Sequence, residues 1–175
     1  MSFLSKLLGT QKDPRDEVRP LWHKVVELAR DPSWYSNCGV ADTVAGRFDM
    51  ITAVLSVVVV RLEASAHHNQ SALLCELFVE DMDGQLREFG INDVVVGKHV
   101  GRLMSSLGGR LGAYRPALAD IETEKLKAAV ERNVTFTEDG SPLSVAGKLQ
   151  TLHNHLAGVG DEALIAAQFG LEPAA

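Results

Sequence analysis

The stretch that decides the fold is LFVEDMDGQLREFGINDVVVGKHVGRLMSSLGGRLGAY, residues 77–114. Its apolar residues, with two leucines just before it, recur at three- and four-residue steps, the period of an amphipathic helix. The first apolar stripe consists of Leu73, Leu74, Leu77, Phe78, Met82, Leu86 and Phe89, and the second of Val96, Val100, Leu103, Met104, Leu107, Leu111 and Tyr114. Gly90 follows the first stripe, where a helix commonly ends in a left-handed residue. Because the connection is short and Asn92 or Asp93 can cap a new helix, we predict an antiparallel helix hairpin.

The charges of the two predicted helices support this hairpin. The acids of the first helix are Glu76, Glu80, Asp81 and Asp83, and the bases of the second are Lys98, Arg102, Arg110 and Arg115. If the chain folds back at Gly90, Asp83 comes level with Lys98, and Glu80 comes level with Arg102. Each such surface pair contributes only about 0–1 kcal/mol. The pairs therefore bias the register, whereas the apolar stripes must hold the hairpin together.

The segment from Phe48 to Leu62 is apolar nearly all round and is predicted to be a central helix. Its valines at 57–60, taken alone, also suit a buried strand, because β-branched runs favour strands. The helical period over the whole segment favours the helix. The apolar run ends at Arg61 and Glu63, short of the roughly 20 residues that a helix needs to cross a bilayer.

Shorter elements are predicted on both sides of these three helices. Trp34 and Tyr35 lie in a predicted loop, 33–39, and are expected to cover the core, with a partner-binding spot as the alternative. The remaining predictions are a helix starting at Asp13 and ending before Pro32, a new helix starting at Pro116 and running to about 132, extended chain or a small hairpin at 134–140, and helices at 142–158 and 161–169. The predicted fold is all-α: a single bundle of about six to seven helices with a central antiparallel helix hairpin.

Length and composition indicate one globular domain. The chain has 175 residues, 46% of them hydrophobic and 23% charged, and a net charge of −6. Its basic residues are scattered, which argues against direct binding of nucleic acid, since that needs a concentrated positive stripe. Cys38 and Cys75 are isolated, so the sequence predicts neither zinc nor a disulfide framework.

Residues 1–15 are predicted to form an N-terminal segment, and residues 16–175 the helical domain. The first eight residues, MSFLSKLL, contain one lysine and an apolar cluster without the long apolar region of a secretory signal. A frayed terminal turn is the simpler interpretation. A weak foothold on a membrane surface is the alternative.

The residues that could carry chemistry do not form a catalytic pattern. The Val96-Gly97-Lys98 run has neither the glycine spacing nor the following Ser or Thr of a phosphate-binding loop. The acids of the first hairpin helix lack the Glu-x-x-His pairs of di-metal bundles. His67-His68 and His153-Asn154-His155 have spacings that suit a shared metal poorly. We predict no catalytic residues, no metal site, no cofactor and no enzyme activity.

Several runs resemble the ubiquinol–cytochrome c chaperone family, helical assembly factors of the cytochrome bc1 complex. The resemblance is carried by DMDGQLREFGIND at 81–93, by VGK at 96–98, by Gly109-Arg110 with Ala113-Tyr114, and by Gly46-Arg47-Phe48-Asp49 upstream. It covers roughly residues 22–118. The chain departs from the family at Leu107-Gly108, where an aromatic pair is usual, and at Phe89, where methionine is commoner.

The resemblance implies a function and a location. A member of this family binds newly made cytochrome b and promotes assembly of the ubiquinol–cytochrome c reductase. It would work in the bacterial cytoplasm, at the cytoplasmic face of the inner membrane, next to the ribosome and with a smaller assembly-factor partner. Contact with the membrane itself would be peripheral at most.

If so, the mechanism is recognition and holding of a client. We expect the recognition surface on the exposed polar side of the hairpin, within the runs that carry the resemblance: Asp81, Asp83, Arg87, Asp93, Lys98, Arg110 and Tyr114. The alternative is that Arg87, Asp93 and Arg110 form caps and salt bridges inside the bundle. Other functions kept open are a helical adaptor with another client, a metal-dependent helical enzyme using the acidic face, and a haem carrier using His67 or His153.

Overall fold

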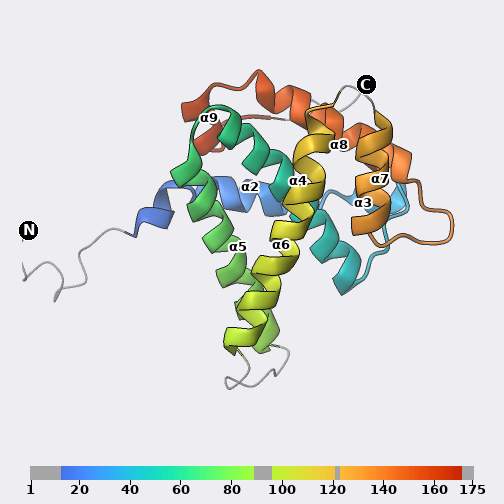
Figure 1. The fold of residues 1–175 in the computed structure, drawn as a ribbon, viewed down its shortest axis with the longest axis horizontal. Coiled ribbons are helices and arrows are strands. Elements are labelled where there is room, and N and C mark those ends of the chain that lie inside the picture. Colours follow the sequence, from blue (N-terminus) through green and yellow to red (C-terminus); the bar gives the residue numbers. More distant parts are fainter. Residues whose placement is uncertain (1–12, 89–95, 121–122, 171–175) are drawn as a thin grey trace, which may run out of the picture.

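The computed structural model describes residues 13–88, 96–120 and 123–170. Within these ranges the chain is a helical bundle (Figure 1). The elements are η1 (Pro14–Glu17), α2 (Arg19–Ala29), α3 (Pro32–Ser36), α4 (Val44–Ala64), α5 (His68–Glu88), α6 (Val96–Leu118), α7 (Thr123–Asn133), α8 (Pro142–Ala157) and α9 (Asp161–Ile165). The all-α prediction is confirmed.

Helix α4 forms the centre of the bundle, as predicted, and the strand alternative for residues 57–60 is wrong. It contacts α2, α5, α6 and α8, and Figure 1 shows it passing between them. Most of its residues are buried, including Met50, Leu55 and Leu62, whose side chains have no solvent exposure. Because several helices surround α4, apolar side chains on every side of it are buried against a neighbouring helix.

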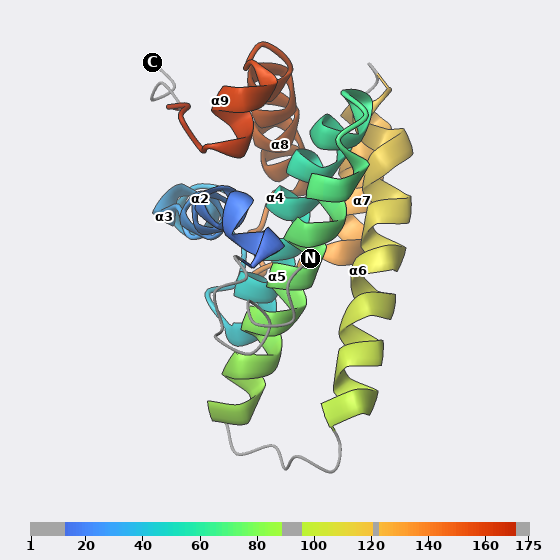
Figure 2. The same ribbon diagram turned by 90° about the vertical axis from the view of Figure 1, so that its left-hand side faces the viewer.

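Helices α5 and α6 form the predicted antiparallel hairpin. Figure 2 shows them side by side, with their far halves extending beyond the other helices. Leu74, Leu77 and Phe78 of the first predicted stripe are buried, as are Leu107 and Tyr114 of the second. Phe89, Gly90, Asn92 and Asp93, on which the predicted turn rests, lie outside the described residues.

One predicted break is wrong: helix α6 continues through Pro116 to Leu118. A proline lacks the N–H that would bond four residues back, and its ring crowds that carbonyl. Here the proline lies in the last turn and the residue four back is Gly112, which is exposed. Water can solvate the freed carbonyl of Gly112. The helix therefore continues for two residues beyond Pro116, and no new helix starts there.

Two smaller boundaries also differ from prediction. The loop holding Trp34 contains the five-residue helix α3, because the Asp31 side chain caps it by accepting from Ser33 N at 2.8 Å. Trp34 is buried as expected, and its Nε1 donates to a backbone carbonyl of α2 at 2.8 Å. The last helix ends at Ile165 rather than 169, and Ala167 then adopts a φ of 57°.

The extended segment predicted at 134–140 pairs with the chain before α4, not with itself. Val40 and Phe136 form an antiparallel bridge, with Ala41 N donating to Thr135 O and Thr137 N to Gly39 O, both at 2.9 Å. Gly39 has a φ of 69°, and a Cβ there would lie 2.5 Å from the backbone of residue 140. This close crossing holds the start of α4 against the end of α7.

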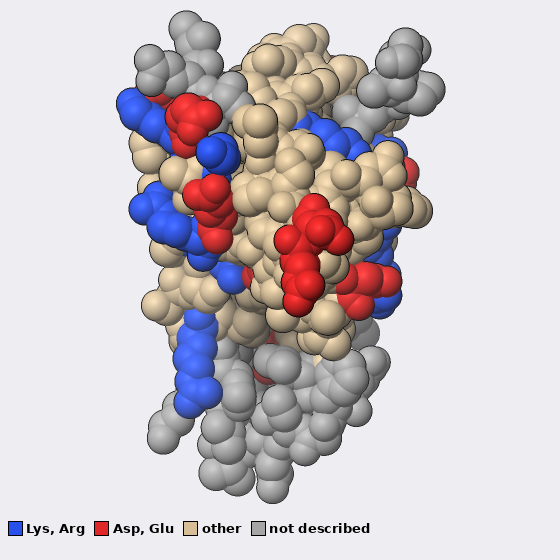
Figure 3. All heavy atoms as spheres, turned by 90° about the vertical axis from the view of Figure 1, so that its right-hand side faces the viewer, with Lys and Arg blue, Asp and Glu red and all other residues tan. Residues whose placement is uncertain are grey.

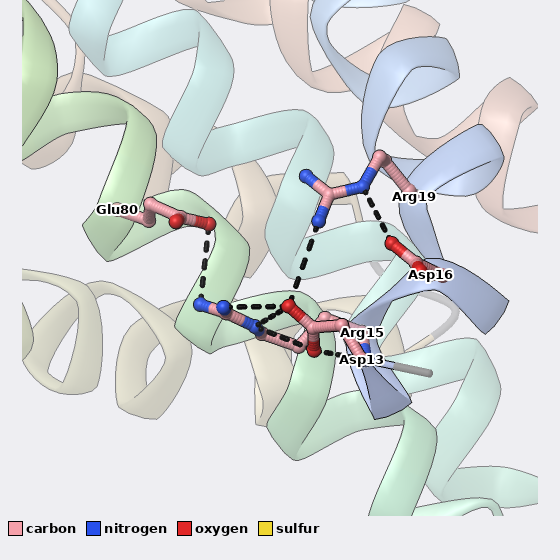
Figure 4. Close-up of polar contacts among 5 residues, drawn as sticks. All are labelled: Asp13, Arg15, Asp16, Arg19 and Glu80. Carbon is pink, nitrogen blue, oxygen red and sulfur yellow. Dashed lines mark hydrogen bonds and ion pairs between the residues drawn. The ribbon is translucent and has the colours of Figure 1, made fainter. Parts of the chain in front are cut away.

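The first described residues dock on the hairpin through charge (Figure 4). Asp13 caps η1, and Arg15 pairs with Asp13 at 2.7 Å and with Glu80 of α5 at 3.2 Å. Glu80, which was predicted to lie level with Arg102, pairs with Arg15 instead. The side chain of Lys98, the predicted partner of Asp83, lies outside the described residues, and so do residues 1–12.

Candidate functional site

A pocket of about 860 Å³ opens where the start of α4, the α5–α6 hairpin and the end of α7 meet. Its apolar wall is formed by Val44, Phe48, Ile51, Met82, Leu103 and Val134. Its positive charges come from Arg30, Arg47, Arg110 and Arg132. Val44 is 73% exposed, an unusual position for a large apolar residue at the start of a central helix. The pocket can therefore offer apolar contact and positive charge to one ligand.

Asp49 holds the floor of this pocket together. It is 5% exposed and accepts from Thr135 N at 2.9 Å and from Thr135 Oγ1 at 2.7 Å. Its other oxygen pairs with Arg110 Nη1 at 2.7 Å. Three elements are thereby joined: α4, α6 and the segment after α7. A buried carboxylate needs such partners, because an unpaired one would be costly.

Arg110 is a wall of the pocket with internal partners. Its Nη1 also donates to Thr52 Oγ1 at 2.7 Å, and its guanidinium lies 5.1 Å from the centre of the Phe48 ring. Only 17% of the side chain is exposed. The alternative interpretation, in which Arg110 makes salt bridges inside the bundle, is what the structure shows for this residue.

Tyr114 does not lie on an exposed polar face, and that expectation is wrong. Its side chain has no exposure, and its hydroxyl has no hydrogen-bond partner among the described residues. Burial raises its pKa well above the ordinary value, with Arg110 lowering it and Asp49 raising it less strongly. Tyr114 ends the apolar stripe of α6, and that stripe decides its orientation.

Of the other predicted surface residues, two are neighbours in sequence of residues that line the pocket. Asp81 and Asp83 are half-buried on α5, beside the lining residues Met82 and Gln85. Asp93 and the side chains of Arg87 and Lys98 lie outside the described residues.

Arg30, Val44, Arg132 and Thr135 line the pocket but did not stand out in the sequence. They come from three segments far apart in the chain. Their only shared signal is that each lies near an end of a helix or in a connecting segment, which is too common to identify a site.

His67 takes part in a charged cluster, and neither cysteine forms a disulfide in the described structure. His67 Nε2 lies 3.2 Å from Asp161, which also pairs with Arg61 at 2.8 Å. Arg61 further donates to the carbonyl of Leu156 in the last turn of α8 and to that of Val159 after it, and so ties the end of α8 and α9 to α4. Cys38 and Cys75 are free, and burial raises the pKa of Cys75 to about 11. Among the described residues no group of three or more His, Cys, Asp or Glu could hold a metal ion.

Three of the four sequence runs that carry the family resemblance contribute residues to this pocket. Arg47, Phe48 and Asp49 belong to the upstream run, Met82 and Gln85 to the run at 81–93, and Arg110 to the third. A family model described as ubiquinol-cytochrome C chaperone matches residues 36–172. The chain belongs to the ubiquinol–cytochrome c chaperone family.

A solved structure agrees with this assignment. The crystal structure of the Cbp3 homologue from Brucella abortus matches with a TM-score of 0.77 and 26% identity, over 98% of this chain and 97% of that one. A comparison with curated proteins gives no match. The candidate site of this ubiquinol–cytochrome c chaperone is thus a pocket to which three of the runs that carry the resemblance contribute. In the described part of the chain no helix is long and apolar enough to span a membrane.

Proposed function

We propose that this chaperone binds newly made cytochrome b and promotes assembly of the cytochrome bc1 complex, and that the pocket holds part of the client. The observation that supports the proposal is the convergence of the three motif runs on one apolar pocket. A chaperone needs no bond chemistry for this role. It needs a surface that covers apolar client side chains until they reach their final partners.

The pocket walls suit a client that belongs in a membrane. Exposed Val44 and the ring of Phe48 offer apolar area, and each Å² of apolar surface removed from water contributes roughly 25 cal/mol. Met82 adds a flexible thioether side chain that adapts to differently shaped partners. A pocket of about 860 Å³ accommodates several side chains and not a whole helix bundle. The client would therefore be held by one segment.

The acidic part of α5 supplies a second contact in this proposal. Loops of membrane proteins on the cytoplasmic side are enriched in Lys and Arg. Asp81 and Asp83 can attract such loops, and Arg87, Asp93 and Lys98 belong to the proposed surface on the strength of the sequence alone. Arg110 contributes as a pocket wall, and Tyr114 is left out because it is buried. The site of action would be the cytoplasmic face of the inner membrane, next to the ribosome and with a smaller assembly factor.

Site-specific crosslinking tests the proposal. A photoreactive phenylalanine analogue replaces Val44 in the pocket or, as a matched control, Leu143. Both are exposed apolar residues in the first turn of a helix, 73% and 53% exposed. Cytochrome b translated in vitro should crosslink from position 44 and only weakly from 143. Equal crosslinking from both positions, or none from position 44, would contradict the proposal.

A further inference from the structure

The pocket carries a charge opposite to that of the chain. The chain has a net charge of −6, yet four arginines line this one pocket and Asp49 is the one acid among its described lining residues. In the view of Figure 3, basic and acidic side chains alternate along the left edge and acidic ones lie near the centre, so the excess of basic residues belongs to the pocket lining and not to this whole face. A pocket of locally inverted charge selects for an anionic group.

Two of these arginines have partners inside the protein, and the other two have none among the described residues. Arg110 pairs with Asp49, and Arg47 pairs with Asp42 at 2.7 Å. Arg30 and Arg132 form no side-chain hydrogen bond or ion pair with any residue in the described ranges. Both are exposed. Their charge is therefore available to a ligand without first breaking an internal pair.

The positions of these two arginines are fixed by the fold. Arg30 is the residue that ends α2, and Arg132 lies in the last turn of α7. The two helices are far apart in sequence, and their C-terminal ends line the same pocket. Planar guanidinium groups match carboxylates through two parallel hydrogen bonds, which are stronger than bonds between neutral groups.

We propose that the pocket recognises a client segment in which a carboxylate is flanked by apolar side chains. Arg30 and Arg132 bind the carboxylate. Phe48, Met82 and Leu103 contact the apolar side chains on either side of it. This deepens the proposed function and rests on it: it names the chemical class of segment that the chaperone holds.

A peptide segment is favoured over other anions by the apolar wall. A free phosphate would leave that wall in contact with water. A segment with an acidic side chain between apolar ones can pair with the arginines and also cover the apolar wall. A ligand that makes only one of these two contacts would bind more weakly. An anionic phospholipid shares this chemistry in part, and the experiment separates it from the peptide.

The test measures binding of fluorescein-labelled twelve-residue peptides to the full chain by fluorescence anisotropy. One peptide contains leucine, phenylalanine and two adjacent glutamates, and its control has glutamine in place of glutamate. We expect the glutamate peptide to bind about tenfold more tightly. The double variant Arg30→Gln/Arg132→Gln should abolish this preference. Arg102→Gln, which removes an exposed arginine outside the pocket lining, should keep it.

Three results would overturn the inference. The two peptides could bind equally, or the preference could survive the double variant. Vesicles containing phosphatidylglycerol could bind in an Arg30- and Arg132-dependent way while the glutamate peptide does not, which would assign the pocket to lipid. Circular dichroism and a thermal melt of the double variant should match the intact chain, since neither arginine has an internal partner in the described structure.

Failure of this inference differs from failure of the proposed function. If the intact chain and the double variant capture cytochrome b translated in vitro equally well, the carboxylate preference is wrong and the client assignment stands. If the intact chain captures no cytochrome b, the client assignment is wrong whichever peptide binds.

Discussion

Replacing Asp49 by alanine should destabilise the protein strongly, because it removes the carboxylate on which three elements converge. In the intact chain the Asp49 carboxylate lies 2.9 Å from Thr135 N and 2.7 Å from Arg110 Nη1. The substitution removes this acceptor from both donors. Removing one partner of a buried ion pair costs about 3–5 kcal/mol. Arg110 keeps its bond to Thr52 and is 17% exposed, so water partly compensates it. We therefore expect a value near the lower end, about 3 kcal/mol.

The assay is urea unfolding followed by circular dichroism, with the midpoint and slope fitted for each variant. Asp42→Ala is the matched control, because its pair with Arg47 has a similar distance of 2.7 Å but is 58–59% exposed. The control should leave the midpoint almost unchanged, since exposed pairs contribute little. A double-mutant cycle of Asp49→Ala with Arg110→Met should give a coupling energy above ~1 kcal/mol. An Asp49→Ala midpoint equal to that of the control, or a coupling near zero, would refute the role assigned to Asp49.

Three further predictions concern the rest of the bundle. Arg61→Ala should cost about 3 kcal/mol, because a nearly buried guanidinium ties α9 to α4, and hydrogen exchange should rise in α9. Gly46→Ala should unfold the start of α4, since its Cβ would lie 1.9 Å from a carbonyl oxygen; Gly108→Ala meets open space and should stabilise by about 0.5–1 kcal/mol in thermal melts. Asp13 has a pKa lowered from 3.8 to about 2 by its hydrogen bonds with Arg15, so its contribution is present above pH 4 and lost as the pH falls towards 2. An NMR titration of the intact chain and of Arg15→Ala should show the lowered midpoint only in the former.

The sequence predicted the bundle because its helices carry strong periodic signals. Helices α4, α5 and α6 have long apolar stripes, and burial of those stripes overrides the β-branched run at 57–60. Boundaries failed where a single residue competed with its context. A proline breaks many helices, but Pro116 lies in the exposed last turn of α6, and the helix continues through it.

The candidate site was predictable only in part. The runs at 46–49, 81–93 and 109–110 all contribute residues to the pocket. A family resemblance identifies such segments without showing whether each residue binds a partner or stabilises the fold. Whether a polar residue in such a run faces water or the interior depends on distant partners. Asp49 of α4 and Arg110 of α6 form an ion pair with each other, and Tyr114 is buried with the apolar stripe of α6. Arg30 and Arg132 gave no signal, since only folding brings the ends of α2 and α7 to one pocket.

The most direct test of the central claim is deletion of the gene, with b-type haem spectra of the membranes and native gels of the bc1 complex. Both the b-type haem signal and the complex should be lost, and the intact gene should restore them. Val44→Asp places a charge in the apolar wall of the pocket, and Leu143→Asp makes the same change in the first turn of α8, where an acid is equally tolerated. We predict that Leu143→Asp restores the complex and Val44→Asp does not. A normal complex in the deletion strain, with no second copy of the gene, would contradict the client assignment, and equal rescue by both variants would contradict the assignment of the pocket.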